Sequence, residues 1–523
     1  MLHEAVEAVA RSAPDAPAVI TADRTVSFAD LGRRIDAARA FIAARTAIGE
    51  RVAVIGDNDL PWIDAYYGVP AVGRVLVFLN HRLAPSELVA MIRRARVRLV
   101  VGPDAFLGSI REAWGTVAEG GGVLPATVSF ADWEVAIASP DPSVASTDID
   151  DERAARRDDD VAWLLFSSGT TAEPKGVLLA HRDLLAATTA TDAARPVADD
   201  DVYVFPFPLC HIAGYGVVRH LARGRPVVLL PRFEPAAFVA AVAEHRGTTT
   251  SLAATMLATL LDHVDASPDA HEQLASLRSI QYGAAPMPAP LLRRADAVLG
   301  VEFAQGYGMT ELAGNAVFLS PEAHRRGLAG DERLLRSAGW PAPGVEVRVV
   351  DDGGRDVGAG TAGEILVRAE QTMVGYLDAP EATAEALVDG WLHTGDIGHL
   401  AADGLLTVVD RKKDLIVTGG ENVSSLEVEA VMRDLPAVAE VAVVGVPDPT
   451  WGENVCAVVV PAPDEPFDAD AVVAELRTRI AGFKIPRHVV VVDLLPVNAT
   501  GKVMKQELRA RFVENPMQLG PRR

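Results

Sequence analysis

Cysteine is scarce in this sequence, since only Cys210 and Cys456 occur among its 523 residues. Two thiols so far apart exclude a disulfide framework and a cysteine-rich zinc site, and they suit a reducing compartment. The sequence also lacks any apolar run near the roughly 20 residues that a membrane-spanning helix needs. Its first residues are acidic where a signal peptide is basic. We therefore expect a cytoplasmic protein with no membrane span.

Positive charge is also in deficit, because 49 Lys and Arg residues face 71 Asp and Glu residues, for a net charge of −22. This balance disfavours nucleic acids and anionic membranes as partners. An anionic ligand must then be held by local devices, such as backbone amides, a placed lysine or a bound cation. A small molecule is the expected partner, and the oligomeric state, monomer or homodimer, stays open.

Strand-like runs alternate with amphipathic helical stretches along most of the chain. Runs at 51–56, 99–102 and 226–230 are typical of buried strands, and 31–45 and 238–245 are typical of helices. This alternation predicts α/β layers with largely parallel sheets.

The later part of the chain has a different pattern. Short strands broken by glycine and aspartate fill 345–409, which predicts a β-rich subdomain. From Ser424 the pattern becomes a helix (426–433), two strands (438–446 and 455–460), a helix (469–481) and a last strand (489–494), as in a small α+β domain.

The most informative segment is 164–177, where an apolar strand runs into a small polar loop and returns to an apolar strand. Small residues let backbone amides converge, hydroxyls add donors and a lysine adds charge, which is the chemistry of a polyphosphate cradle. The segment is not a Walker A loop, because Pro174 stands where that pattern needs glycine and no Ser or Thr follows Lys175. A polar hairpin is the alternative. The candidate phosphate-binding residues are Ser167, Ser168, Gly169, Thr170, Thr171 and Lys175.

A second segment, 305–311, joins two glycines to an aromatic residue and an acid. Gly306 lets a ligand approach the backbone, and Tyr307 offers a ring face to adenine. Thr310 and Glu311 follow, which could meet a phosphate and its Mg²⁺. Taken alone, a structural turn explains this segment equally well.

Three further segments are weaker signals. Asp396 lies on a tight turn, where a carboxylate suits ribose hydroxyls and an ordinary β-turn is the alternative. A charge run at 409–416 is followed by Gly419-Gly420, which indicates a linker or a functional hinge. Lys502 lies near the C-terminus on a turn, where a lone lysine is usually an ordinary surface residue.

Taken in this order, the five segments resemble the adenylate-forming superfamily of acyl-CoA synthetases, firefly luciferases and non-ribosomal peptide synthetase adenylation domains. The similarity runs from about Pro17 to about Arg509 and is closest to AMP-forming fatty or aryl acyl-CoA ligases. It implies an N-terminal ATP- and acyl-binding domain (1–410) with two layered α/β sheets and a β-rich subdomain. A mobile α+β domain (411–523) would follow, with its hinge near Lys413.

The resemblance assigns a role to each candidate residue. Thr170, Thr171 and Lys175 would bind the β- and γ-phosphates, while Gly283, Ala284, Ala285, Pro286 and Tyr307 would flank adenine. Thr310 would contact the α-phosphate, Glu311 would bind Mg²⁺, Asp396 and Arg411 would hold the ribose, and Lys502 would be the catalytic lysine of adenylation. His211 would be the aromatic gate beside the acyl carbon.

The resemblance also implies a second conformation for thioester formation. Rotation about Lys413 would withdraw Lys502 and bring Gly419 and Gly420 to a pantetheine tunnel, with Trp451 and Phe483 contacting coenzyme A. Three positions depart from the common pattern: Ala172 replaces a glycine, Ser424-Ser425 replaces an aromatic-proline pair, and Lys413 replaces an aspartate. The second departure puts the shape of the tunnel in doubt.

The acyl pocket is expected among four segments: 211–216, 250–256, 282–285 and 305–306. Many of these positions are small, and no arginine or lysine is evident there for a second carboxylate. A medium- or long-chain fatty acid or a bulky apolar aryl or cyclic acid is therefore expected, with ATP, Mg²⁺ and coenzyme A as cofactors. Transfer to an amine or a carrier-protein thiol stays open. An inactive nucleotide binder or a luciferase-like oxidation are further alternatives.

Overall fold

The computed structural model describes residues 1–116, 123–139, 157–167, 174–283, 287–419, 421–463, 465–498 and 502–519. The chain forms two compact units: Met1–Glu346 with Arg368–Leu392, and Val347–Val367 with His393–Arg523. The β-rich stretch expected at 345–409 is thus divided between them. The domain boundary expected between residues 410 and 411 separates a fixed domain from a mobile one. A division by contacts does not test this boundary, so it stays a prediction. None of the helices in the described residues is long and apolar enough to cross a membrane.

One sheet of the first unit has seven strands in the order β18-β8-β7-β4-β3-β5-β6. The five strands from β7 to β6 pair in parallel, while β8 and β18 are antiparallel additions. All of β4 is buried, as expected for an apolar strand covered on both faces. The strands are β3 (Arg51–Ile55), β4 (Val75–Leu79), β5 (Val97–Gly102), β6 (Ala126–Ser129), β7 (Val161–Ser167), β8 (Lys175–Ala180) and β18 (Gly375–Tyr376).

The other sheet of this unit has nine strands in the order β15-β14-β13-β12-β11-β9-β10-β1-β2. Its six central strands are parallel, and β2, β14 and β15 are antiparallel. The strands are β1 (Pro17–Ile20), β2 (Thr25–Ser27), β9 (Tyr203–Phe205), β10 (Val227–Leu229), β11 (Thr249–Ser251), β12 (Ser279–Gly283), β13 (Glu302–Met309), β14 (Gly314–Leu319) and β15 (Trp340–Pro341).

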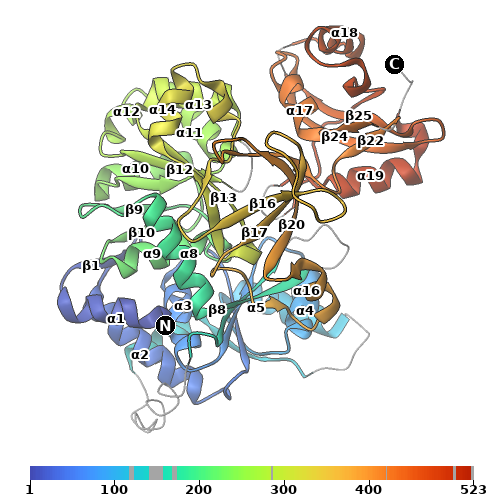
Figure 1. The fold of residues 1–523 in the computed structure, drawn as a ribbon. Coiled ribbons are helices and arrows are strands. Elements are labelled where there is room, and N and C mark those ends of the chain that lie inside the picture. The colour runs from blue at the N-terminus through green and yellow to red at the C-terminus, as the bar shows by residue number, and fades with distance from the viewer. Residues whose placement is uncertain are drawn as a thin grey trace. The chain divides into compact units, whose positions relative to one another are not determined.

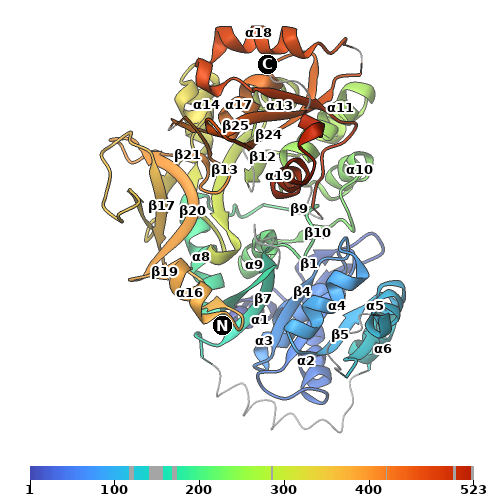
Figure 2. The ribbon, with the colours of Figure 1, turned by 90° about the vertical axis from the view of Figure 1, so that its right-hand side faces the viewer.

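Helices flank these sheets (Figure 1). Helix α3 (Leu60–Ala71) is buried along its whole length, whereas α4 (Pro85–Arg94) and α5 (Asp104–Thr116) lie beside β5 (Figure 2) and are partly exposed. The others in this unit are α1 (Leu2–Ser12), α2 (Phe28–Ala43), α6 (Phe130–Ala138), α8 (His181–Ala194), α9 (Tyr215–Ala222), α10 (Pro235–His245), α11 (Ala254–Ala266), α12 (Ala270–Gln273), α13 (Ala289–Leu299), α14 (Pro321–Leu328), α15 (Glu332–Leu335) and α16 (Pro380–Ala386), with short 3₁₀ turns η1 (Ile212–Gly214) and η2 (Thr310–Leu312).

The second unit holds most of one small sheet and all of another. The first sheet consists of β16 (Glu346–Val350), β17 (Gly363–Arg368), β20 (Trp391–Leu400) and β21 (Leu406–Arg411), and β19 (Leu387–Val388) pairs with the first residues of β20. The second consists of β22 (Ile416–Thr418), β23 (Glu421–Val423), β24 (Val438–Asp448), β25 (Gly452–Pro461) and β26 (His488–Val491). Its helices are α17 (Ser425–Arg433), α18 (Ala469–Arg479) and α19 (Lys505–Glu514), with η3 (Gly482–Lys484) and η4 (Pro516–Leu519).

The expected fold class is confirmed, with a large mixed α/β N-terminal part and a smaller C-terminal part. The predicted strands and helices occur with shifted ends; β24, for instance, runs to Asp448 and β26 stops at Val491. Helix α19 was not expected, because only Leu508 and Phe512 of its ten residues are buried and they leave no clear apolar period.

Asn58 connects the two sheets of the first unit. It follows β3, and its side-chain amide donates to the carbonyls of Phe207 (2.7 Å) and Leu230 (2.8 Å), while its Oδ1 accepts from the Leu209 amide (2.6 Å). The three backbone groups lie just beyond β9 and β10, so a buried side chain satisfies loop groups that neither sheet can pair. These loops lead directly into the segment that contains His211.

Candidate nucleotide and acyl site

Eight expected site residues lie outside the described residues, and their roles stay predictions: Ser168, Gly169, Thr170, Thr171, Ala284, Ala285, Pro286 and Gly420. The strands on both sides of the expected phosphate loop are described. β7 and β8 are antiparallel neighbours, and Ser167 pairs with Lys175 in the register of the two strands. The two predicted strands are therefore present, and Lys175 stands where the second strand begins.

Lys175 belongs to a chain of three side chains. Its Nζ lies 4.9 Å from the ring centroid of Tyr376, and the Tyr376 hydroxyl donates to Glu311 Oε1 at 3.0 Å. Burial, followed by the negative charge of Glu311, raises the pKa of Tyr376, so the phenol stays a hydrogen-bond donor. The arrangement holds the expected phosphate lysine and the expected Mg²⁺ ligand on two sides of one ring.

Glu311 is positioned by its backbone as well as by its side chain. It lies in η2 directly after β13, is 8% exposed, and its carbonyl accepts from the Met373 amide at 2.9 Å. In the described part of the chain no cluster of three or more His, Cys, Asp or Glu side chains could hold a metal ion. One carboxylate with phosphate oxygens is, however, a usual donor set for Mg²⁺, so Glu311 fits this ion.

Glycines make the backbone accessible beside Tyr307. Gly283 pairs with Gly306 across β12 and β13, and a Cβ on Gly283 would lie 2.4 Å from the Gly306 carbonyl oxygen. A Cβ on Gly308 would lie 2.0 Å from the Gly314 carbonyl oxygen. Real Cβ atoms do not come this close, so these strand ends can meet only with glycine at both positions. The result is a flat backbone surface next to the half-buried Tyr307.

His211 is half-buried and packs against another aromatic ring. Its Nδ1 accepts from the Ala213 amide at 3.1 Å, and its ring stacks on Phe207 with centroids 6.2 Å apart. Burial lowers the pKa of His211 to about 4, so the imidazole is uncharged at neutral pH. This agrees with a gate that shapes the acyl pocket without carrying charge.

In the second unit the structure brings Asp396, Arg411 and Lys502 together. Asp396 and Arg411 are paired residues of β20 and β21, and their side chains form an ion pair at 2.7 Å. Lys502 is exposed, yet the pKa of its ammonium is lowered, first by desolvation and then by the positive charge of Arg411, against the opposing charge of Asp396. A carboxylate suited to ribose hydroxyls thus lies near a lysine that is electrostatically coupled to it.

The expected hinge and coenzyme A residues also lie in this unit. Burial lowers the pKa of Lys413 to about 8. Gly419 has a positive φ of 59° and lies against the Trp451 ring, which a Cβ on Gly419 would approach to 2.6 Å. Trp451 and Phe483 are 44% and 41% exposed, which leaves both rings open to a ligand.

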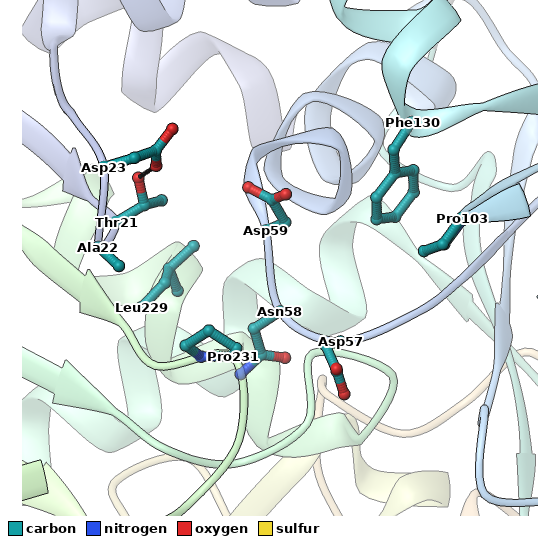
Figure 3. Close-up of a pocket in the computed structure, with 10 residues that line it drawn as sticks. All are labelled: Thr21, Ala22, Asp23, Asp57, Asn58, Asp59, Pro103, Phe130, Leu229 and Pro231. Atoms are coloured by element: carbon teal, nitrogen blue, oxygen red, sulfur yellow. Dashed lines mark hydrogen bonds between the residues drawn. The ribbon is translucent and has the colours of Figure 1, made fainter. Parts of the chain in front are cut away.

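A separate hollow of about 210 Å³ lies in the first unit beside Asn58, and none of the expected site residues lines it (Figure 3). Its three carboxylates already have partners. Asp23 accepts from Thr21, Asp59 accepts from the Leu60 amide, and Asp57 pairs with Arg232. Three acids and no lysine or arginine are among the residues that line the hollow, so it does not suit the phosphates of a nucleotide.

Comparison with known proteins agrees with this geometry. The sequence profile of the AMP-binding enzymes matches residues 6–377, and that of the AMP-binding enzyme C-terminal domain matches residues 427–502. The chain belongs to the AMP-binding enzyme family. The resemblance predicted from the five segments is thereby confirmed.

Similar members of the family include ligases and an amide synthetase. A feruloyl-CoA synthase of Amycolatopsis is 36% identical over 513 residues, which cover 96% of this chain and 97% of the relative. A Mycobacterium tuberculosis ligase that joins a methyl-dioxo-octahydroindenyl propanoyl group to CoA is 36% identical over 516 residues, which cover 97% of each chain. The amide bond synthetase of Marinactinospora thermotolerans has a similar structure, with a TM-score of 0.84, 30% identity and coverage of 98% of this chain and 100% of that one.

Two features of this AMP-binding enzyme were not found from its sequence. Tyr376 lies in a two-residue strand far from the other motifs, and no local pattern marks it. The second feature is the contact made by the unusual Ser424-Ser425 pair. The buried Asp410 carboxylate accepts from the Ser425 amide (2.6 Å) and from the Ser425 hydroxyl (2.7 Å) at the start of α17. The serine pair therefore caps the start of α17 with hydrogen bonds, whereas the common aromatic-proline pair would begin the helix with a proline in its first turn.

The Tyr376 hydroxyl is expected to support Mg·ATP binding. Tyr376→Phe keeps the ring beside Lys175 but removes the hydrogen bond to Glu311. A hydrogen bond contributes about 0.5–1.5 kcal/mol, so Mg·ATP affinity measured by titration calorimetry should fall about 2- to 10-fold. Tyr67→Phe is the matched control, because the buried Tyr67 hydroxyl has no hydrogen-bond partner among the described residues. Equal affinities for the two variants would contradict this role of Tyr376.

Proposed function

We propose that this chain is an AMP-forming carboxylate–CoA ligase. It converts ATP and a carboxylic acid into acyl-AMP and pyrophosphate, and then forms a thioester with coenzyme A. The observation that carries this proposal is the group of Asp396, Arg411 and Lys502. It combines a buried carboxylate suited to ribose hydroxyls with a lysine that is electrostatically coupled to it. Family membership and relatives named as CoA ligases support the same reaction.

In the first step the carboxylate oxygen attacks the α-phosphorus of ATP. The new bond joins this oxygen to phosphorus, and the bond to the bridging oxygen breaks, so that its electron pair leaves with pyrophosphate. Negative charge grows around the phosphorus, and Lys502 neutralises it through a donor already in place. Lys175 would hold the departing phosphates, Thr310 would contact the α-phosphate, and Glu311 would hold Mg²⁺, which would supply further charge neutralisation.

In the second step a thiolate sulfur attacks the acyl carbon, and the carbon–oxygen bond to AMP breaks. The carboxylate oxygen leaves with AMP, which is a good leaving group and needs no further activation. Rotation about Lys413 replaces Lys502 with the segment of Gly419 and Gly420. The exposed rings of Trp451 and Phe483 are suited to contact coenzyme A.

The acid is proposed to be a medium- or long-chain fatty acid or a bulky aryl or cyclic acid. Named relatives act on an aryl and on a bicyclic acyl group, which supports the bulky end of this range. An amine acceptor is the second candidate function, because an amide bond synthetase covers nearly the whole chain with a TM-score of 0.84. Both functions share the adenylation step and differ only in the nucleophile.

Pyrophosphate release over a panel of acids tests the proposal. The panel contains fatty acids of 4–16 carbons and substituted cinnamic, indole and cyclic acids, each measured with coenzyme A, with an amine or with neither. We expect sustained turnover with coenzyme A and at most a single turnover without it. Sustained turnover with the amine alone would replace the CoA ligase by an amide synthetase. No pyrophosphate from any acid would contradict the adenylation step itself.

Lys502→Ala separates the two steps. Loss of a well-placed donor to a charged transition state costs about 10²–10³ in rate, so pyrophosphate release should fall by that factor. Thioester formation from a chemically prepared acyl-AMP should stay within about threefold of wild type. Lys484→Ala, which removes a half-buried lysine paired with Glu427 in the same unit, is the control and should keep both rates. Normal pyrophosphate release by Lys502→Ala would show that another group performs adenylation.

A further inference from the structure

A buried polar network in the second unit joins residues from both sides of the expected hinge at Lys413. Asp410 belongs to β21 and precedes the hinge in the chain. Ser425 and Lys505 are the first residues of α17 and α19, so both follow it. Asp410 and Ser425 are 1% and 0% exposed, and the Lys505 side chain is 12% exposed.

The Ser425 hydroxyl is the middle of this network. It accepts from the Lys505 ammonium at 2.6 Å and donates to Asp410 Oδ2 at 2.7 Å. The Ser425 amide donates to the same carboxylate oxygen at 2.6 Å. A charge at each end strengthens the hydrogen bonds between them, so one hydroxyl connects an ammonium group firmly to a carboxylate.

Lys505 is also fixed to the part of the chain that follows the hinge. Its ammonium pairs with Glu429 Oε1 of α17 at 2.6 Å, and this oxygen accepts from the Val443 amide of β24 at 2.9 Å. Glu429 is 2% exposed. Lys505 therefore belongs to the body of the small α+β part, and its bond to Ser425 leads from this body back to β21.

Both ends of the network adjoin residues of the expected adenylation site. Asp410 directly precedes Arg411, whose amide donates to Asp410 Oδ1 at 2.8 Å. Lys505 follows the turn of Lys502, in which the Lys502 amide donates to Asn498 Oδ1 at 2.9 Å and the Asn498 amide donates to the Lys502 carbonyl at 2.8 Å. The network thus connects the strand that holds Arg411 to the segment that carries Lys502.

A rotation about Lys413 would separate the two ends of the network. Asp410 would stay with β21, while Ser425 and Lys505 would move with α17 and α19. The bonds between Ser425 and Asp410 would then break, and a buried carboxylate that loses its donors is costly. Contacts made in one of two conformations shift the equilibrium toward that conformation.

We propose that Ser425 and Lys505, acting through Asp410, are positioning residues that hold the adenylation conformation and set its balance against the thioester-forming one. The proposal rests on the function proposed above and deepens it, because it names a contact that controls the change between the two steps. It also gives the Ser424-Ser425 departure a role. A proline at position 425 would offer Asp410 neither a hydroxyl nor an amide hydrogen.

The competing explanation is structural, because the same side chains also join α17 and α19 to β24. A structural role predicts that loss of the Ser425 hydroxyl slows both steps alike and leaves the ratio of their rates unchanged. A role in the balance predicts that the ratio of adenylation to thioester formation falls, since each rate is proportional to the population of its own conformation.

The test measures each step in a single turnover. Adenylation is followed by pyrophosphate release, and thioester formation is followed from a chemically prepared acyl-AMP with coenzyme A. Ser425→Ala keeps the cap that Ser424 makes with the Glu427 amide (3.2 Å). It should lower the ratio of the first rate to the second by about tenfold or more, because it removes a hydrogen bond to a charged group that only one conformation makes. Lys505→Met should lower the ratio in the same direction.

Arg509→Gln is the matched control. It breaks the ion pair between Arg509 of α19 and Asp414, whose atoms are 2.8 Å apart. Both residues follow Lys413, so the pair moves as one body and is the same in both conformations. The ratio should therefore stay within about twofold of wild type.

The outcomes separate this inference from the proposed function. An unchanged ratio in Ser425→Ala, or an equal change of the ratio in Arg509→Gln, overturns the inference, while the thioester formed by wild type still supports the CoA ligase. A fall in the ratio confined to Ser425→Ala and Lys505→Met supports it. Absence of thioester in wild type with every acyl-AMP of the panel overturns the proposed function, on which the inference rests.

Discussion

The site depends on how closely three strands approach at the ends of β12 and β13. At Gly283, Gly306 and Gly308 an added Cβ would lie 2.4, 2.3 and 2.0 Å from neighbouring atoms, which no real side chain tolerates. This contact places Tyr307 beside bare backbone and sends the chain directly into Thr310 and Glu311. It also puts the Asn315 side chain of β14 over Gly306, at the edge of the segments expected to form the acyl pocket.

The second constraint is electrostatic. A chain of net charge −22 repels a nucleotide polyanion at long range, and the binding energy must come from short contacts. The structure offers such contacts as coupled groups: Lys175 with Tyr376 and Glu311 in the first unit, and Arg411 with Asp396 and Lys502 in the second. Each cation has an acidic or aromatic neighbour, which orients the cation and limits the free-energy cost of desolvating it when no ligand is bound.

Local chemistry explains which features could be predicted from the sequence. The β7–β8 hairpin, the strand entering Thr310 and the β20–β21 pair of Asp396 and Arg411 are marked by short patterns of glycine, hydroxyl and charge. Tyr376 and Asn315 could not be found in this way, because their positions result from strand pairing between distant segments. The same is true of the Asp410–Ser425 contact, where sequence showed only an unusual serine pair. The roles of Thr170 and Thr171 remain predictions.

The central claim is that the acid is activated as an adenylate, and an oxygen-18 transfer measurement tests it most directly. The acid is labelled in its carboxylate and turned over with unlabelled ATP, and the AMP is then analysed by mass spectrometry. The account predicts one labelled oxygen in AMP, because the attacking carboxylate oxygen stays on phosphorus when the acyl carbon is released. Unlabelled AMP, or label in inorganic phosphate together with ADP, would contradict it.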